Sequence, residues 1–122
     1  MPKAQRVKGH SYERAIANLF KKYFPLAKRG LQNRGGTAEA PDVDGTPWYI
    51  ECKRQKANCS LRRALMQAEA GQYVVTEERT TRRDLRPPMA ICKNDRERDM
   101  MAMYLDDFMK IVERIYGEQT EK

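Results

Sequence analysis

Residues 48–53 constrain the fold most, because their side chains alternate with the period of a β-strand. Successive side chains on a strand point to opposite faces, so one set can pack inward while the other carries charge. The inward set is Trp48, Ile50 and Cys52, and the opposite set is Tyr49, Glu51 and Lys53. We therefore expect a strand whose first set is buried in a core.

The segment just before this strand, PDVDG, predicts a β-hairpin. A two-residue loop at 45–46, or a four-residue loop centred there, pairs Val43 with Trp48 and Asp42 with Tyr49. In this register Asp42 lies on the charged face of the next strand. Asp44 precedes a glycine, and an aspartate in that position usually serves the turn itself.

Two carboxylates and an ammonium on one exposed patch predict a metal site. Asp42 and Glu51 repel each other, and their hard oxygen atoms suit Mg²⁺ or Mn²⁺. Such an ion can polarise a phosphoryl oxygen and activate water, while Lys53 orients the nucleophile or offsets charge at phosphorus. Glu13, at the margin of an apolar helix stripe, could ligate a second metal or a metal-bound water.

The remaining patterns predict an α/β domain in the order αβββαββα, with a central mixed sheet flanked by helices. Residues 1–9 are basic and aperiodic, which predicts a flexible arm, and residues 118–122 form a short tail. A single domain over 10–117 lies between them. Its first helix begins near Ser11 and is ended by Pro25.

The expected elements after the first helix are a strand in 26–31, a glycine-bearing loop, the hairpin and a helix ending near Gly71. Asn58 or Ser60 can cap that helix. Residues 72–86 stay open between a strand, a solvated basic stretch and a helical extension. Residues 88–93 and 100–105 read as a second hairpin.

The last expected helix begins at Asp106 and Asp107, because acidic groups complement the helix dipole there. Its apolar residues recur at helical spacing and predict a buried face, and Gly117 ends it. The buried face consists of Phe108, Ile111, Val112 and Ile115.

The composition favours an acidic partner. Lys and Arg total 24 against 17 Asp and Glu, a formal net charge of +7. We expect no membrane span and no signal peptide, and therefore a cytoplasmic protein. Three cysteines without a Cys-x-x-Cys spacing predict reduced thiols, and nothing in the sequence calls for a small organic cofactor.

Taken together, KGHSYERAIANLFKKYFP, PDVDG and WYIECKRQ resemble the core of the PD-(D/E)xK nucleases. More narrowly, the chain is similar to archaeal-type Holliday-junction resolvases and their small phage-encoded relatives. The resemblance implies a restriction-endonuclease-like fold and a dimeric, magnesium-dependent enzyme that cuts four-way DNA junctions symmetrically, in the host cytoplasm if phage-encoded. It assigns catalytic roles to Glu13, Asp42, Glu51 and Lys53, and suggests Thr37 as the loop hydroxyl.

Basic residues outside this core predict phosphate contacts that weaken with salt. The expected DNA-binding residues are Lys3, Arg6, Lys8, Arg34, Arg54, Lys56, Arg62 and Arg63. Two other functions stay open. One is a nuclease with the same core that cuts nicked, flapped or ordinary duplex DNA, and the other is a non-catalytic nucleic-acid-binding protein whose carboxylates only pair with lysines.

Overall fold

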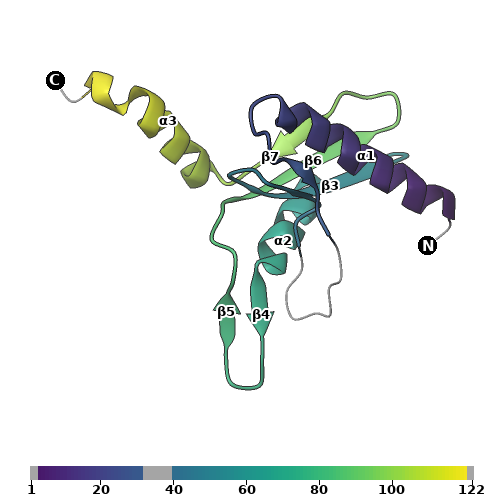
Figure 1. The fold of residues 1–122 in the computed structure, drawn as a ribbon, viewed down its shortest axis with the longest axis horizontal. Coiled ribbons are helices and arrows are strands. Elements are labelled where there is room, and N and C mark those ends of the chain that lie inside the picture. Colours follow the sequence, from purple (N-terminus) through teal and green to yellow (C-terminus); the bar gives the residue numbers. More distant parts are fainter. Residues whose placement is uncertain (1–2, 32–39, 121–122) are drawn as a thin grey trace.

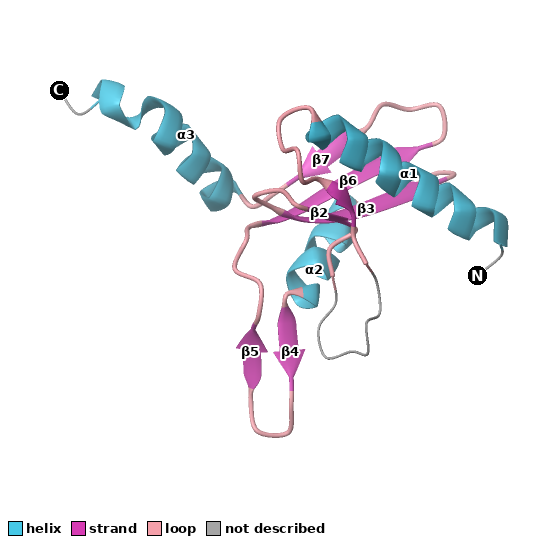
Figure 2. Ribbon diagram, in the orientation of Figure 1, coloured by secondary structure: helices cyan, strands magenta, loops and turns pink. Residues whose placement is uncertain are grey.

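A computed structural model describes residues 3–31 and 40–120, and the side chains of 8–31 and 40–117. The architecture is mixed α/β, as the sequence predicts (Figures 1 and 2). The elements are α1 (Lys3–Lys21), β1 (Lys28–Arg29), β2 (Val43–Asp44), β3 (Tyr49–Gln55), α2 (Leu61–Gly71), β4 (Tyr73–Val75), β5 (Thr80–Arg82), β6 (Pro88–Asn94), β7 (Met100–Ala102) and α3 (Leu105–Thr120).

The central sheet has five strands in the order β1-β2-β3-β6-β7. The neighbouring strands β3 and β6 are parallel, and the other pairs are antiparallel, so the sheet is mixed as expected. A parallel pair needs a long crossover connection, which α2 and the β4–β5 hairpin provide here. The two long central strands therefore lie side by side, and β2 flanks β3 on its other edge.

Helices cover both faces of the sheet (Figure 1). On one face, α1 contributes Tyr12 and Ile16 to a cluster with Ile50 and Cys52, and Trp48 packs against it, so the expected inward set of β3 is confirmed. On the other face, α2 packs over β6. The second face of β3 is consequently not the exposed patch that the sequence analysis expected, and its residues are mostly buried.

Ser60 is the N-cap of α2, which resolves the choice between Asn58 and Ser60. Its hydroxyl accepts a hydrogen bond from the backbone N–H of Arg63 at 3.0 Å. The helix then ends at Gly71, as predicted.

Ser60→Ala should lower the free energy of unfolding by about 1 kcal/mol, because the N–H of Arg63 loses its acceptor. Urea denaturation followed by circular dichroism measures this difference. Asn58 has a φ of 61°, which glycine adopts without strain, so Asn58→Gly tests the discarded cap and should not cost the helix a bond. A larger loss for Asn58→Gly than for Ser60→Ala would contradict the assignment.

Two expectations about the ends of the chain were wrong, and the structure decides the segment that the sequence left open. Residues 3–9 are the first turns of α1 and not an arm before it, because the helix continues through Gly9. Gly117 does not end α3, which runs to Thr120. The open segment 72–86 contains the β4–β5 hairpin, which adds a strand pair to the expected order and projects from the body (Figure 1).

No helix in the described part of the chain has the length and apolar character needed to cross a membrane.

Candidate active site

The β2–β3 hairpin differs from its expected register. Val43 pairs with Ile50 and not with Trp48, and the N–H of Asp42 donates to the carbonyl of Ile50 at 2.8 Å. The pairing of Val43 is shifted by two residues, so Val43 keeps its expected face and lies in the cluster with Ile50 and Cys52. Asp42 lies close enough to Glu51 for its negative charge to raise the pKa of that carboxyl.

Local chemistry explains why the turn is centred later than expected. The Thr46 hydroxyl bridges the backbone N–H and carbonyl of Trp48, at 3.1 Å each. Pro47 has no N–H to offer a strand partner. Asp44 accepts a hydrogen bond from the N–H of Gly45 at 2.8 Å, which gives it the turn role assigned to it above. The loop therefore spans 45–48.

The Asp42 carboxylate sits where β2 leaves β3. Its Oδ2 accepts a hydrogen bond from the backbone N–H of Cys52 at 2.8 Å, in place of a strand carbonyl. The carbonyl of Asp42 accepts from the N–H of Gly30 at 2.8 Å, and a Cβ at Gly30 would lie 1.7 Å from the Pro41 oxygen, so only glycine fits. These bonds hold a carboxylate that is 7 % exposed.

Glu51 and Lys53 stand on β3 beside this carboxylate. Glu51 is 8 % exposed, and its Oε2 lies 3.3 Å from the Lys53 Nζ. Burial, together with the negative charge of Asp42, raises the pKa of Glu51 to about 7, and Lys53 opposes this shift. The Glu51 carboxyl can therefore change its protonation state near neutral pH.

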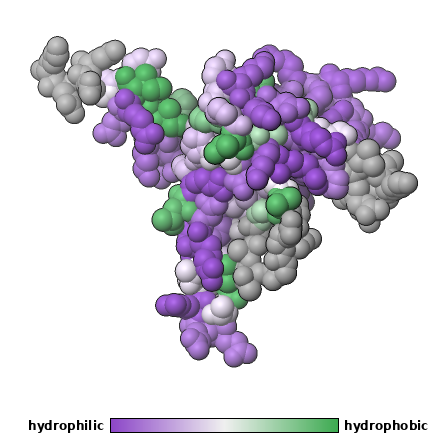
Figure 3. Space-filling view, viewed as in Figure 1, coloured by the Kyte–Doolittle hydropathy of each residue, from purple (hydrophilic) through white to green (hydrophobic). Residues whose placement is uncertain are grey.

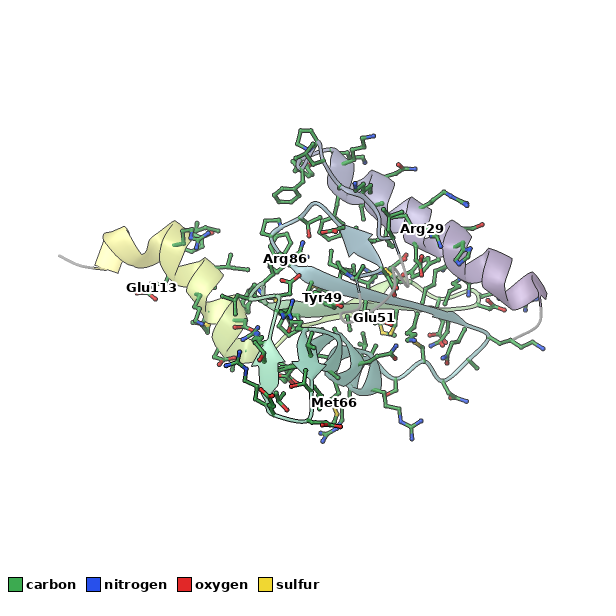
Figure 4. All side chains as sticks on the ribbon, turned by 60° about the horizontal axis from the view of Figure 1, so that its bottom comes forward. Arg29, Tyr49, Glu51, Met66, Arg86 and Glu113 are labelled. Carbon is green, nitrogen blue, oxygen red and sulfur yellow. The ribbon has the colours of Figure 1, made fainter. Side chains whose placement is uncertain are left out.

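Glu13 reaches the same region from α1. Burial and the negative charge of Asp42 raise the pKa of Glu13, against the opposing effect of Arg29. Arg29 on β1 donates from Nε to Glu13 Oε1 at 2.8 Å, and Figure 4 labels it together with Glu51. The structure thus brings together residues from α1, β2 and β3.

Sequence reasoning missed Arg29 and the ion pairs of Arg86. Arg29 belongs to a two-residue strand, and only the β1–β2 pairing opposite Val43 places it near the acidic residues. Arg86 binds Asp44 at 2.8 Å and Asp84 at 2.6 Å, and its guanidinium carbon lies 6.0 Å from the ring centre of Tyr49. Figure 4 labels Arg86 and Tyr49. Asp84 lies only two residues from Arg86, but no local pattern in the sequence indicates the contact with Asp44.

The other expected site residues are spread over the molecule. Thr37 and Arg34 lie outside the described residues, as do the side chains of Lys3 and Arg6. Lys8 and Arg54 both bind Asp95, the former at 2.8 Å. The remaining basic residues are exposed on the β3–α2 connection and on α2: Lys56, Arg62 and Arg63.

The donor chemistry of this cluster fits a hard divalent cation. Three carboxylates gather where burial and mutual repulsion raise the pKa of Glu13 and of Glu51, and an added cation would relieve that repulsion. Within the described residues, no three ligand side chains are arranged as a ready cage. Glu13 and Glu51 instead face Arg29 and Lys53, so a cation would compete with these two side chains.

Comparisons with known proteins add nothing to this geometry. No family model, no curated protein and no solved structure matches the chain.

Proposed function

We propose that the chain is a metal-dependent DNA endonuclease with a restriction-endonuclease-like fold, and that it resolves four-way junctions. The observation that carries this proposal is the proximity of the Asp42 carboxylate to Glu51, together with the hydrogen bond that Asp42 accepts from the Cys52 N–H. The neighbouring Lys53 and the approach of Glu13 from α1 support the same chemistry. The order of α1, three strands, α2 and a strand parallel to β3 is what the resemblance leads one to expect.

Glu13, Asp42 and Glu51 would hold Mg²⁺ or Mn²⁺, which supplies a Lewis acid for the phosphoryl oxygen and for water. The chain's own residues perform the remaining tasks. The hydrogen bond that Asp42 Oδ2 accepts from the Cys52 N–H holds this carboxylate in position. Lys53 can direct the attacking water or offset the charge that develops at phosphorus. Water adds to phosphorus, and the bond to the leaving sugar oxygen breaks.

The proposed partner is branched DNA, which a protein of net charge +7 attracts through phosphate contacts. Three exposed basic residues lie on the β3–α2 connection and in the first turn of α2: Lys56, Arg62 and Arg63. We assign them to contacts with the DNA backbone. Symmetric cutting of a junction needs two active sites, so the proposal includes a two-fold dimer.

A gel of labelled products tests the substrate. A synthetic four-way junction, labelled on each strand in turn, is compared with linear duplex of identical sequence, in Mg²⁺ and in excess chelator. Paired cuts confined to the junction and to Mg²⁺ support the proposal. If linear duplex is cut equally well, the protein is a nuclease without junction selectivity. If no DNA is cut, the protein only binds nucleic acid, and its carboxylates serve ion pairs such as Glu13–Arg29.

A further inference from the structure

The last helix, α3, leaves the body of the protein and packs against no other described helix or strand. Figure 1 shows it projecting beyond the sheet, and Figure 3 shows hydrophobic residues gathered along it. Three of its large apolar side chains are mostly or half exposed: Leu105 at 73 %, Phe108 at 46 % and Ile115 at 61 %. A sixteen-residue helix is marginally stable in water by itself, so this apolar face requires a cover.

The apolar residues of α3 occupy one side of the helix. At about 100° per residue, Leu105, Phe108, Val112 and Ile115 follow one another at spacings of three and four. Arg114 falls on the opposite side. Of the residues expected on the buried face, Phe108 and Ile115 are exposed in a single chain, contrary to the prediction, whereas Ile111 and Val112 are half-buried.

A groove beside the first residues of α3 has a mainly apolar lining. It has a volume of about 450 Å³ and is lined by the apolar side chains of Leu65, Met66, Ala70, Tyr73 and Tyr104 and by the charged side chains of Arg62 and Glu69. Tyr104 donates to Glu69 Oε1 at 2.9 Å, which ties the chain to α2 just before α3 begins. Met66 is half exposed, so the groove is not filled by the chain's own α3.

We propose that α3 is a dimerisation helix that lays its apolar face in the groove of a second copy. Every copy carries both the helix and the groove, so in a two-fold dimer the α3 helix of each copy can occupy the groove of the other. With Met109 and Tyr116, α3 has five large exposed apolar side chains, and the groove adds Met66 and Tyr73. At roughly 200 Å² each and about half exposed, these seven side chains offer about 700 Å² per copy. A standard interface buries about 800 Å² per partner, so the exposed area suits a stable dimer.

This inference deepens the proposed function by placing the dimer interface, and its use in paired cutting rests on that function. The interface involves α3 and α2, and none of the carboxylates Glu13, Asp42 and Glu51 belongs to it. The carboxylate sites of both copies would therefore stay open to DNA. In the dimer Lys56 and Arg63 would make the backbone contacts, because Arg62 lines the groove.

Sedimentation velocity of the full chain without DNA or metal tests the interface. The wild-type protein should sediment with twice the mass of one chain, and Ile115→Asp should weaken the dimer at least tenfold. Arg114→Asp is the matched control, because it introduces the same residue one position away on the polar face, and it should stay dimeric. Met66→Glu should weaken the dimer, whereas Gln67→Glu, on the exposed side of α2, should not. Far-ultraviolet circular dichroism verifies that each variant is folded.

A wild-type monomer at all concentrations up to hundreds of micromolar would overturn the inference, as would dimers unaffected by Ile115→Asp. A dimer weakened by Ile115→Asp and not by Met66→Glu would also overturn it, because the helix would then contact something other than the groove. The sedimentation experiment does not depend on cleavage. If the proposed dimer interface is wrong, the tests of Asp42 and Glu51 as site residues are unaffected.

Discussion

Asp42→Asn should reduce magnesium-dependent cleavage at least about a hundredfold, because an amide supplies one neutral oxygen where the cation needs a charged ligand. The fold should survive the change. The Asn side-chain oxygen can still accept the hydrogen bond from the Cys52 N–H, which Asp42 accepts at 2.8 Å. Removal of one negative charge should leave DNA binding intact or slightly stronger. Cleavage is measured on the labelled junction, and binding by gel shift in Ca²⁺.

Glu113→Gln provides the control for charge. Glu113 is exposed on α3, labelled in Figure 4, so its substitution removes the same charge far from the site. It should cut at the wild-type rate. Unchanged cleavage by Asp42→Asn would exclude this carboxylate from catalysis, and lost cleavage in both variants would point to a general effect of charge.

Arg86→Ala should cause the largest loss in the free energy of unfolding, about 2–3 kcal/mol. The change leaves the carboxylates of Asp44 and Asp84 without their cationic partner where the β4–β5 hairpin joins the body. Arg86 also donates to the Thr46 carbonyl at 3.2 Å, so it ties the hairpin root to the β2–β3 turn. The corresponding fall in Tm is roughly 8–12 °C. Thermal unfolding followed by circular dichroism measures it. Arg79→Ala, on the exposed part of the same hairpin, should change stability by less than about 0.5 kcal/mol.

The same ion pair gives a pH dependence with a defined sign. Hydrogen bonding to Arg86 lowers the pKa of Asp84 below its ordinary value of 3.8. A carboxyl whose pKa is lowered by folding contributes stability above its unfolded pKa, and that contribution is lost as the pH falls through the folded value. The stability difference between wild type and Arg86→Ala should therefore shrink below about pH 4. A difference that stays constant down to pH 2 would contradict the role of the pair.

The proximity of Asp42 and Glu51 could be predicted from the sequence, because a hairpin that turns at Gly45 brings the segments on either side of it together. The register could not be predicted, since the Thr46 side chain and the bonds of Asp44 decide where the turn lies. The observed register moved the partner of Val43 from Trp48 to Ile50 and still left Asp42 near Glu51.

The burial of the site could not be predicted, because charged residues on a strand normally indicate solvent. Glu51 is buried by neighbours that are distant in sequence, and so its raised pKa has no local signature. Periodicity likewise identified the apolar residues of α3 correctly, but a hydrophobic stripe does not reveal whether its cover comes from the same chain or from a second one. Phe108 and Ile115 are therefore exposed in one copy, contrary to expectation.

The central claim is that Glu13, Asp42 and Glu51 form one site for a divalent cation, and isothermal titration of Mn²⁺ into the DNA-free protein tests it most directly. We predict saturable binding by the wild type that weakens at least about tenfold in Asp42→Asn and in Glu51→Gln, while Glu113→Gln binds as the wild type does. Equal heats for all four proteins, or no saturable binding by the wild type, would contradict the claim.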